Sequence, residues 1–354
     1  MRRILFFMFA LSLAVSCSAA HADGIVKRVQ KAVAISTLDR PGTHPFHLKA
    51  MLAPSLDRDK DSGRTGLVEI WWKSPTEWRR EVSCPGFHQV QIISGGQTWQ
   101  KNDGDYFPNW LREITDALML PVPLSADLYK QMDSGEVKQL PGRTLVRNGQ
   151  ETHTIGMTHL SWTILSSNGE VQKGMGASIA LNDQTGLLLY GGGFGWSGEF
   201  HDYQEFHKRQ VARTVSGGSP EVTAKIIILE DLHAVQNGWF TAGADGDPYS
   251  IQIEFPDELD LRKNLLPQDP TPWPPTKDGP LEGVLTTEVS IDRTGAVRET
   301  GTIVSDNQSL NDAARTRIEA MRFKPFVLNG APVQVLSRIT LAFKTVRPDT
   351  PVAQ

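Results

Sequence analysis

The chain has few cysteines and only one long apolar run. Its two cysteines, Cys17 and Cys84, stand in a sequence of 354 residues. Export with loss of the first segment would leave Cys84 alone, and a single cysteine forms no internal disulfide, so hydrophobic cores must stabilise the fold. Apart from residues 4–15, no apolar stretch approaches the roughly 20 residues that a membrane-spanning helix needs.

A strong charge of either sign is also lacking. The 36 Lys and Arg residues are nearly balanced by 40 Asp and Glu residues, which gives a formal net charge of −4. A mildly acidic chain without basic clusters argues against nucleic acid, and against an anionic membrane surface, as an electrostatic partner.

Catalytic motifs are missing in the same way. The glycine-rich stretch 190–199 is not followed by the Gly-Lys-Ser/Thr of a phosphate-binding loop. Glu199 stands where a nucleophile elbow needs its last glycine. No Ser-His-Asp or Cys-His arrangement can be nominated, and Cys84 precedes Pro85-Gly86 with no identifiable partner. We therefore expect no catalytic residue, no cofactor and no enzyme activity.

The N-terminus has the order of a secretion signal. Arg2 and Arg3 precede the apolar residues 4–15, and Ala20-His21-Ala22 forms an A-x-A site. This order predicts cleavage between Ala22 and Asp23 and a periplasmic location. The apolar run is short for a span of about 20 residues, which disfavours an uncut membrane anchor. Lipid attachment at Cys17 is a further alternative.

Four segments are expected after the signal peptide 1–22. Residues 23–264 are rich in short strand patterns separated by turn residues, and helical patches interrupt them at 108–120 and 126–132. Residues 265–282 hold six prolines, too many for a strand or helix, and are expected to be a semi-rigid linker. Residues 283–346 form a separate small module, and residues 347–354 form a polar tail.

The module 283–346 has the clearest pattern of strands and turns. In its first strand Leu285, Val289 and Ile291 alternate with polar residues, and a turn follows at 292–295 with glycine in its last position. Residues 309–312 resemble a capping box and predict the start of a helix. After an Asn-Gly turn at 329–330, the odd positions form one apolar face of a long strand: Val333, Val335, Ile339, Leu341 and Phe343.

This module resembles the C-terminal domain of the TonB family of periplasmic energy transducers. The matching residues are Gly283-Val284, Asp292 with Gly295, Leu310 with Ala313-Ala314, Phe323-Lys324-Pro325, Gly330-Ala331-Pro332-Val333 and Phe343. Two positions depart from the family pattern, since Trp273-Pro274-Pro275 replaces an opening Tyr-Pro and Met321 stands where the family often has tryptophan. The resemblance implies a βαββ module that adds a strand to a partner's peptide or sheet. The residues expected at that contact are Phe323, Pro325, Val333, Val335 and Ile339.

The large segment 23–264 carries many of the chain's nine tryptophans in or beside its proposed strands. Large aromatics mostly pack in cores, and the other interpretation is the wall of a cavity for an acyl chain or another hydrophobe. Many strands without disulfides can enclose such an interior by wrapping one sheet around helices. The residues proposed to line a ligand site are Trp78, Trp99, Trp110 and Ile114.

This segment also resembles the periplasmic lipoprotein-carrier family, the LolA/LolB-like half-barrel. The matching stretches are residues 66–70, Ser74-Pro75 with Trp78-Arg79, residues 94–99, and the hairpin at 181–189. The resemblance implies a mostly β (α+β) fold, with an antiparallel half-barrel whose concave face is covered by helices. Residues 108–120 would be a covering helix. The insertion 134–158 departs from a minimal carrier.

Two clusters of metal-ligand residue types were weighed. Residues 57–63 resemble the start of a calcium loop, but Ser62 and Val68 stand where an EF-hand needs glycine and glutamate, which favours a solvated loop. Strand alternation in 199–207 would put Glu199, His201, Tyr203, Glu205 and His207 on one face, as a zinc site or a polar lining. Since no further ligand pair is identifiable, no metal site is predicted.

The leading hypothesis is an exported, non-enzymatic binding protein of the periplasm. The half-barrel would hold a hydrophobic ligand or an acylated protein, and the C-terminal module would dock an envelope or outer-membrane protein by strand addition. One alternative is a TonB-type energy transducer for outer-membrane transport. Another is a metal-dependent hydrolase that uses the 199–207 cluster.

Overall fold

A computed structural model describes most of the chain. The described residues are 24–56, 63–104, 106–123, 138–140, 144–165, 171–193, 195–218, 221–233, 238–246, 253–268 and 271–348. The predicted signal peptide, Cys17, the helical patch 126–132, most of the loop 57–63 and the end of the polar tail lie outside them. None of the helices in the described part has the length and apolar character that a bilayer crossing requires.

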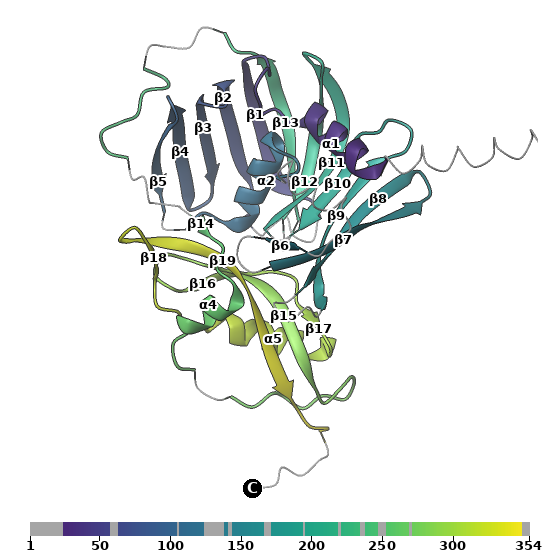
Figure 1. The fold of residues 1–354 in the computed structure, drawn as a ribbon. Helices are drawn as coiled ribbons and strands as arrows, with labels where there is room; N and C mark the ends of the chain where they lie inside the picture. Colours follow the sequence, from purple (N-terminus) through teal and green to yellow (C-terminus); the bar gives the residue numbers. More distant parts are fainter. Residues whose placement is uncertain are drawn as a thin grey trace, which may run out of the picture.

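One large antiparallel sheet dominates the described residues (Figure 1). Its spatial order is β5-β4-β3-β2-β1-β13-β12-β11-β10-β9-β8-β7-β6. Its strands are β1 (Phe46–Pro54), β2 (Gly66–Ser74), β3 (Glu77–Cys84), β4 (Phe87–Ser94), β5 (Gln97–Asp103), β6 (Lys138–Leu140), β7 (Thr144–Thr154), β8 (Met157–Leu165), β9 (Val171–Asn182), β10 (Leu188–Gly193), β11 (Trp196–Phe206), β12 (Arg209–Gly217) and β13 (Val222–Asp231). Most neighbours are consecutive hairpins, and the pairing of β1 with β13 joins the two halves.

Two helices cover the concave face of this sheet, and their apolar side chains fill the interior of the half-barrel. They are α1 (Ile25–Ser36) and α2 (Asn109–Met119). Helix α2 turns Trp110, Leu111 and Ile114 into the same core as strand residues such as Trp72 and Phe200. Helix formation here follows from the apolar spacing, because positions three and four apart share one face. The mostly β half-barrel with covering helices is therefore confirmed.

A second, smaller sheet forms the C-terminal module, with order β14-β19-β15-β16. Strand β17 pairs with β15, and β18 pairs with β19. The elements are β14 (Ile253–Glu254), α4 (Glu258–Lys263), β15 (Glu282–Ile291), β16 (Val297–Thr300), β17 (Val304–Ser305), the 3₁₀ turn η2 (Gln308–Leu310), α5 (Asn311–Glu319), β18 (Phe326–Leu328) and β19 (Ala331–Lys344). The predicted Asn-Gly hairpin is present, with φ of 50° at Asn329 and 87° at Gly330.

The start of α5 differs from the predicted capping box. Asn307 Oδ1 accepts a hydrogen bond from the Ser309 amide at 3.1 Å, so Asn307 caps the 3₁₀ turn that leads into α5. An amide side chain at this place satisfies a donor that the first turn leaves free, as Ser309 was expected to do.

The proline-rich stretch lies against the C-terminal module. The Trp273 ring meets the Phe343 ring edge to face at 6.1 Å between centroids. The Thr276 amide donates to Val346 O at 3.0 Å, and the Asn307 side chain donates to Asp278 O and Pro280 O. Strand β14 and helix α4 also contact β19, so the module gathers chain from both sides of the prolines.

Candidate functional site

The polar face of the small sheet meets the half-barrel. In β15 the odd residues Leu285, Val289 and Ile291 are buried in the module's own core. The intervening Thr286, Glu288 and Ser290 line a cavity shared with the half-barrel. Strand alternation explains this division, since neighbouring residues point to opposite faces.

Two residues of the module hold the chain that leads into α2. The buried Gln334 side chain accepts from the Phe107 amide at 3.1 Å and donates to Phe107 O at 2.9 Å. Glu299 Oε1 accepts from Tyr106 Oη and from the Asn109 amide, each at 2.8 Å. We call this set of four hydrogen bonds the α2 clamp. Three of the four bonds go to backbone groups beside the start of α2, and the Asn109 amide is one that the first helical turn leaves free.

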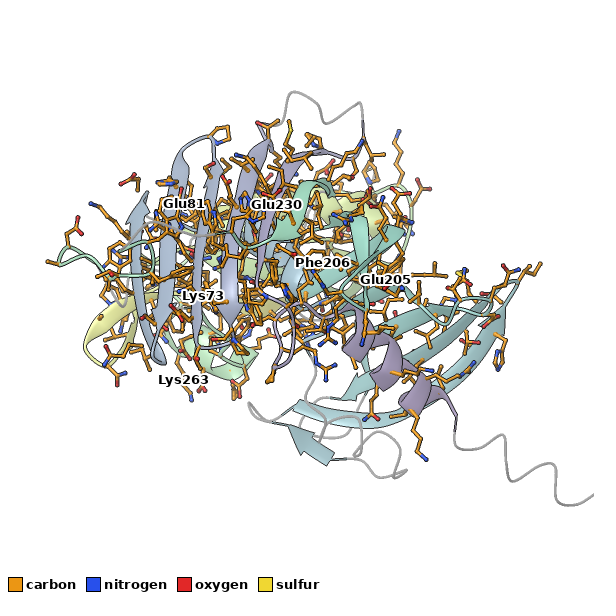
Figure 2. All side chains as sticks on the ribbon, turned by 90° about the horizontal axis from the view of Figure 1, so that it is seen from above. Lys73, Glu81, Glu205, Phe206, Glu230 and Lys263 are labelled. Atoms are coloured by element: carbon orange, nitrogen blue, oxygen red, sulfur yellow. The ribbon has the colours of Figure 1, made fainter. Side chains whose placement is uncertain are left out.

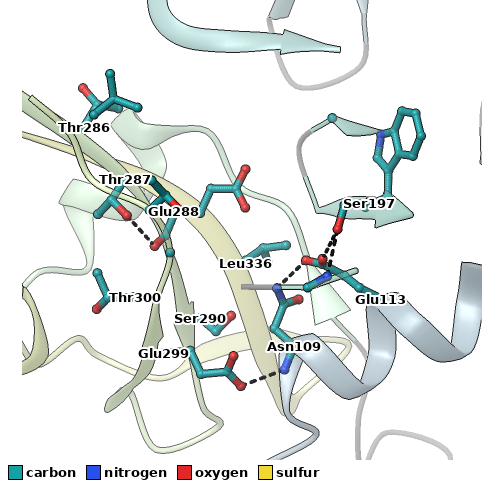
Figure 3. A pocket seen from close by; sticks show the side chains of 16 residues that line it. Asn109, Glu113, Ser197, Thr286, Thr287, Glu288, Ser290, Glu299, Thr300 and Leu336 are labelled. Atoms are coloured by element: carbon teal, nitrogen blue, oxygen red, sulfur yellow. Dashed lines mark hydrogen bonds between the residues drawn. The ribbon is translucent and has the colours of Figure 1, made fainter. Parts of the chain in front are cut away.

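The cavity beside the clamp has a volume of about 400 Å³. Figure 3 shows carboxylates around it that come from three elements: Glu113 from α2, Glu288 from β15 and Glu299 from β16. The other lining residues are mostly small or hydroxyl-bearing: Asn109, Gly193, Trp196, Ser197, Gly218, Thr286, Thr287, Ser290, Thr300, Gly301, Thr302, Val304 and Leu336.

Burial raises the pKa of each of these three carboxyl groups. Burial raises the pKa of Glu113 even though Arg112 lies 3.8 Å away, and Asn109 and Ser197 donate to the same group. Burial and the nearby Glu113 charge raise the pKa of Glu288 to about 7, against the opposing effect of Arg338. Burial also raises the pKa of Glu299. The site therefore changes its charge near neutral pH, when Glu288 gains or loses a proton.

Three of the four proposed ligand-site residues contact one core. Trp110 and Ile114 of α2 are buried there, and Trp78 of β3 packs against it. Trp99 faces the other side of the sheet, since it pairs with Ile92 while Trp78 pairs with Ile93. Trp99 instead contacts the backbone at Gly243 and Gly246, where an added Cβ would clash with its ring.

The proposed partner-contact residues lie mainly inside the C-terminal module. Phe323, Val335 and Ile339 are buried in its core, Val333 is buried as well, and Pro325 is exposed. Their side chains pack the module, so a partner strand would bind the backbone edge of β19. Strand addition at this edge stays a prediction.

Part of that edge is already covered by the chain itself. Strand β18 pairs with residues 331–333 of β19, and β14 pairs with residues 334–335. Further along, Glu258 of α4 accepts from the Thr340 amide at 2.8 Å, and Arg262 of α4 donates to Thr340 O. A partner strand between 331 and 340 would have to displace these contacts.

The predicted single face in 199–207 is wrong. Asp202 has left-handed backbone, with φ of 55°, and both His201 and Asp202 are exposed. Tyr203 turns inward instead, where its hydroxyl donates to Leu188 O at 3.0 Å. A left-handed residue breaks the alternation on which the prediction depended.

Comparisons with known proteins gave one family match and several similar solved structures. Residues 277–345 match the family model described as Gram-negative bacterial TonB protein C-terminal. A search of curated proteins found no match. Among solved structures, the chain is similar to a domain named for outer membrane lipoprotein sorting from Vibrio parahaemolyticus, with 12% identity, a TM-score of 0.33, and coverage of 62% of this chain and 97% of the other.

A LolA superfamily protein from Nitrosomonas europaea is similar at 8% identity and a TM-score of 0.32, over 61% of this chain and 96% of that one. At these TM-scores and identities, the similarity does not transfer a function to this chain. The match assigns residues 277–345, the segment that holds α5 and the strands β15 to β19, to the TonB C-terminal family model.

Proposed function

We propose that the chain is an exported, non-enzymatic binding protein of the cell envelope. Its half-barrel takes a hydrophobic ligand or an acylated protein, and its TonB-type domain docks an envelope partner. The single observation that carries the proposal is the α2 clamp, because it ties the docking domain to the helix that fills the half-barrel.

The interior of the half-barrel is apolar but filled in this structure. Trp110, Leu111 and Ile114 of α2 lie against a wall that includes Leu48 and Trp72. If α2 moved away, this wall and the helix face would form a surface suited to an acyl chain, since burial of apolar area drives such binding. Ligand entry therefore requires release of α2.

Release of α2 depends on the C-terminal domain. The clamp holds residues 106–109, and Arg112 of α2 donates to Gly195 O at 2.7 Å in the turn between β10 and β11. A partner that engages the edge of β19 displaces β14, which pairs with Gln334, and α4, which bonds to Thr340 further along the strand. Binding of the partner at β19 is thereby coupled to the position of α2 through β14 and Gln334.

Native mass spectrometry of the untagged mature chain tests ligand binding. We expect co-purifying lipid, or binding of an added fatty acid, and tighter binding in Gln334→Leu, which loosens the clamp. The matched control is Gln204→Leu, an exposed glutamine on β11. The proposal fails when neither the wild type nor Gln334→Leu binds lipid or a fluorescent hydrophobic probe.

A further inference from the structure

Four of the chain's nine histidines gather at one end of the large sheet. His44 precedes β1, His47 lies in β1, His207 is in the turn between β11 and β12, and His233 follows β13. The pairing of Phe46 with Asp231 puts the last residue of β13 beside the start of β1. The cluster thus draws on three segments that are far apart in sequence.

His44, His207 and Asp231 are in direct contact. His44 Nδ1 lies 3.3 Å from Asp231 Oδ1, and His207 Nε2 forms a hydrogen bond with the same oxygen. The two imidazole rings stack with centroids 4.0 Å apart and planes 12° apart. One ligand atom from each residue lies within 4.8 Å of the other two.

The backbone at His207 is unusual for its residue type. His207 and Lys208 occupy the two central turn positions with φ of 46° and 66°. Such hairpin turns normally use Asn-Gly or similar pairs, because other residues are strained at positive φ. A histidine at such a position costs backbone strain, and strained residues often mark functional sites.

The neighbouring His47 has a different set of partners. Its Nε2 lies 2.9 Å from Glu69 Oε1 and its Nδ1 3.2 Å from Glu230 Oε1, so both nitrogens are used. Glu230 is labelled in Figure 2, where the side chains over this part of the sheet are drawn. His47 therefore contacts Glu69 and Glu230, whereas His44 and His207 both contact the carboxylate of Asp231.

We propose that His44, His207 and Asp231 form a binding site for a divalent transition-metal ion, with Zn²⁺ as the best match. Two imidazole nitrogens and one carboxylate oxygen are a common zinc donor set, whereas calcium and magnesium prefer oxygen ligands alone. A fourth position is left for water or for His233.

The geometry allows this with small movements. Ligand atoms around tetrahedral zinc lie about 3.3–3.6 Å apart, as bond lengths of about 2.0–2.2 Å require. Side-chain rotations that move the three ligand atoms by about 1 Å would bring them to this spacing. The side chains of His44, His207 and Asp231 are 49%, 41% and 48% exposed, which gives an ion and its water direct access.

Such a site would join the β11–β12 turn to the start of β1 and the end of β13, which are paired strands. The bound ion would restrain segments that contribute to the rim of the half-barrel near the end of α1, where Arg209 donates to Ala34 O at 2.8 Å. This role is independent of the proposed ligand and of the docking partner.

Isothermal titration of the untagged, chelator-treated mature chain with ZnCl₂ tests the proposal. We expect one saturable site per chain with micromolar affinity, and a loss of at least tenfold in affinity in His44→Ala and in His207→Ala. The matched control is His88→Ala, because His88 forms a similar exposed pair with Asp103 at 3.6 Å but has no second histidine.

A second measurement covers variants that fold poorly. Cobalt absorption of the wild type should show a ligand-field band that the double variant His44→Ala/His207→Ala lacks, with circular dichroism checking that it is folded. Absence of saturable zinc binding at 100 µM, or equal zinc affinity in the wild type and a folded double variant, would overturn the proposal.

Discussion

The substitution Glu288→Gln tests the electrostatics of the contact between the two sheets. Glu288 is opposite Arg338 in the β15–β19 pair and faces the cavity that it shares with Glu113. Burial and Glu113 raise its pKa from 4.5 to about 7. Folding therefore favours the protonated form of this group.

The sign of the pH dependence follows from that shift. The stability that Glu288 contributes as a neutral acid is complete below its unfolded pKa of 4.5 and is lost as the pH rises through about 7. A shift of this size corresponds to at most about 3 kcal/mol at pH above 8, since one pKa unit is about 1.4 kcal/mol. Glutamine keeps the shape but never ionises, so it removes this loss.

Denaturant titrations between pH 4 and pH 8.5 measure the effect. We expect the free energy of unfolding of Glu288→Gln to match the wild type at pH 4 and to exceed it by up to about 3 kcal/mol at pH 8.5. The control is Glu205→Gln, an exposed residue of β11 labelled in Figure 2, for which the difference should not change with pH. A constant difference for Glu288→Gln across this range would refute the reasoning.

Three further predictions concern the clamp, the covered edge and Cys84. Gln334→Leu removes both side-chain hydrogen bonds to the Phe107 backbone, so we expect the free energy of unfolding to fall by about 2–4 kcal/mol. Amide hydrogen exchange at residues 106–111 should become faster, and unchanged exchange would contradict this. Glu258→Ala removes the acceptor of the Thr340 amide, so amide exchange at 340 should rise while exchange at 289 stays the same. Burial, followed by the Glu299 charge, raises the pKa of Cys84 to about 11, so native alkylation at pH 8 should be much slower than in denaturant; equal rates would contradict it.

Local patterns in the sequence predicted much of the fold. Turn residues and alternation predicted that 23–264 is rich in short strands, and in the C-terminal module they predicted β15, the helix α5 and the long strand β19 after its Asn-Gly turn. Helix α1 and strand β1 were missed although both carry a signal. Ile25, Val29 and Val33 recur at helical spacing, and the apolar residues of β1 alternate with polar ones. Both elements could therefore be predicted from local spacing alone.

Other features had no local signal. Thr286, Glu288 and Ser290 have the sequence of a solvent-facing strand edge, yet they face a helix about 180 residues earlier in the chain. The proline content at 265–282 predicted a spacer because it excludes regular structure, but it says nothing of packing against Phe343. The partners of His207 come from segments before β1 and at the end of β13, which spacing within 199–207 does not reveal. Long-range contacts of this kind depend on the whole topology.

The composition of the contact between the sheets fits a domain that detaches. The four hydrogen bonds of the α2 clamp contribute roughly 0.5–1.5 kcal/mol each, or somewhat more where Glu299 is charged. Ionisation of Glu288, which faces the same cavity, lowers the stability of the folded chain by up to about 3 kcal/mol at pH above 8. The contact between the sheets is therefore polar and weakens as the pH rises. Release of α2 would also expose Leu111 and Ile114, whose burial contributes roughly 1.5–3 kcal/mol each, so under the proposed function the partner and the ligand together must offset that burial.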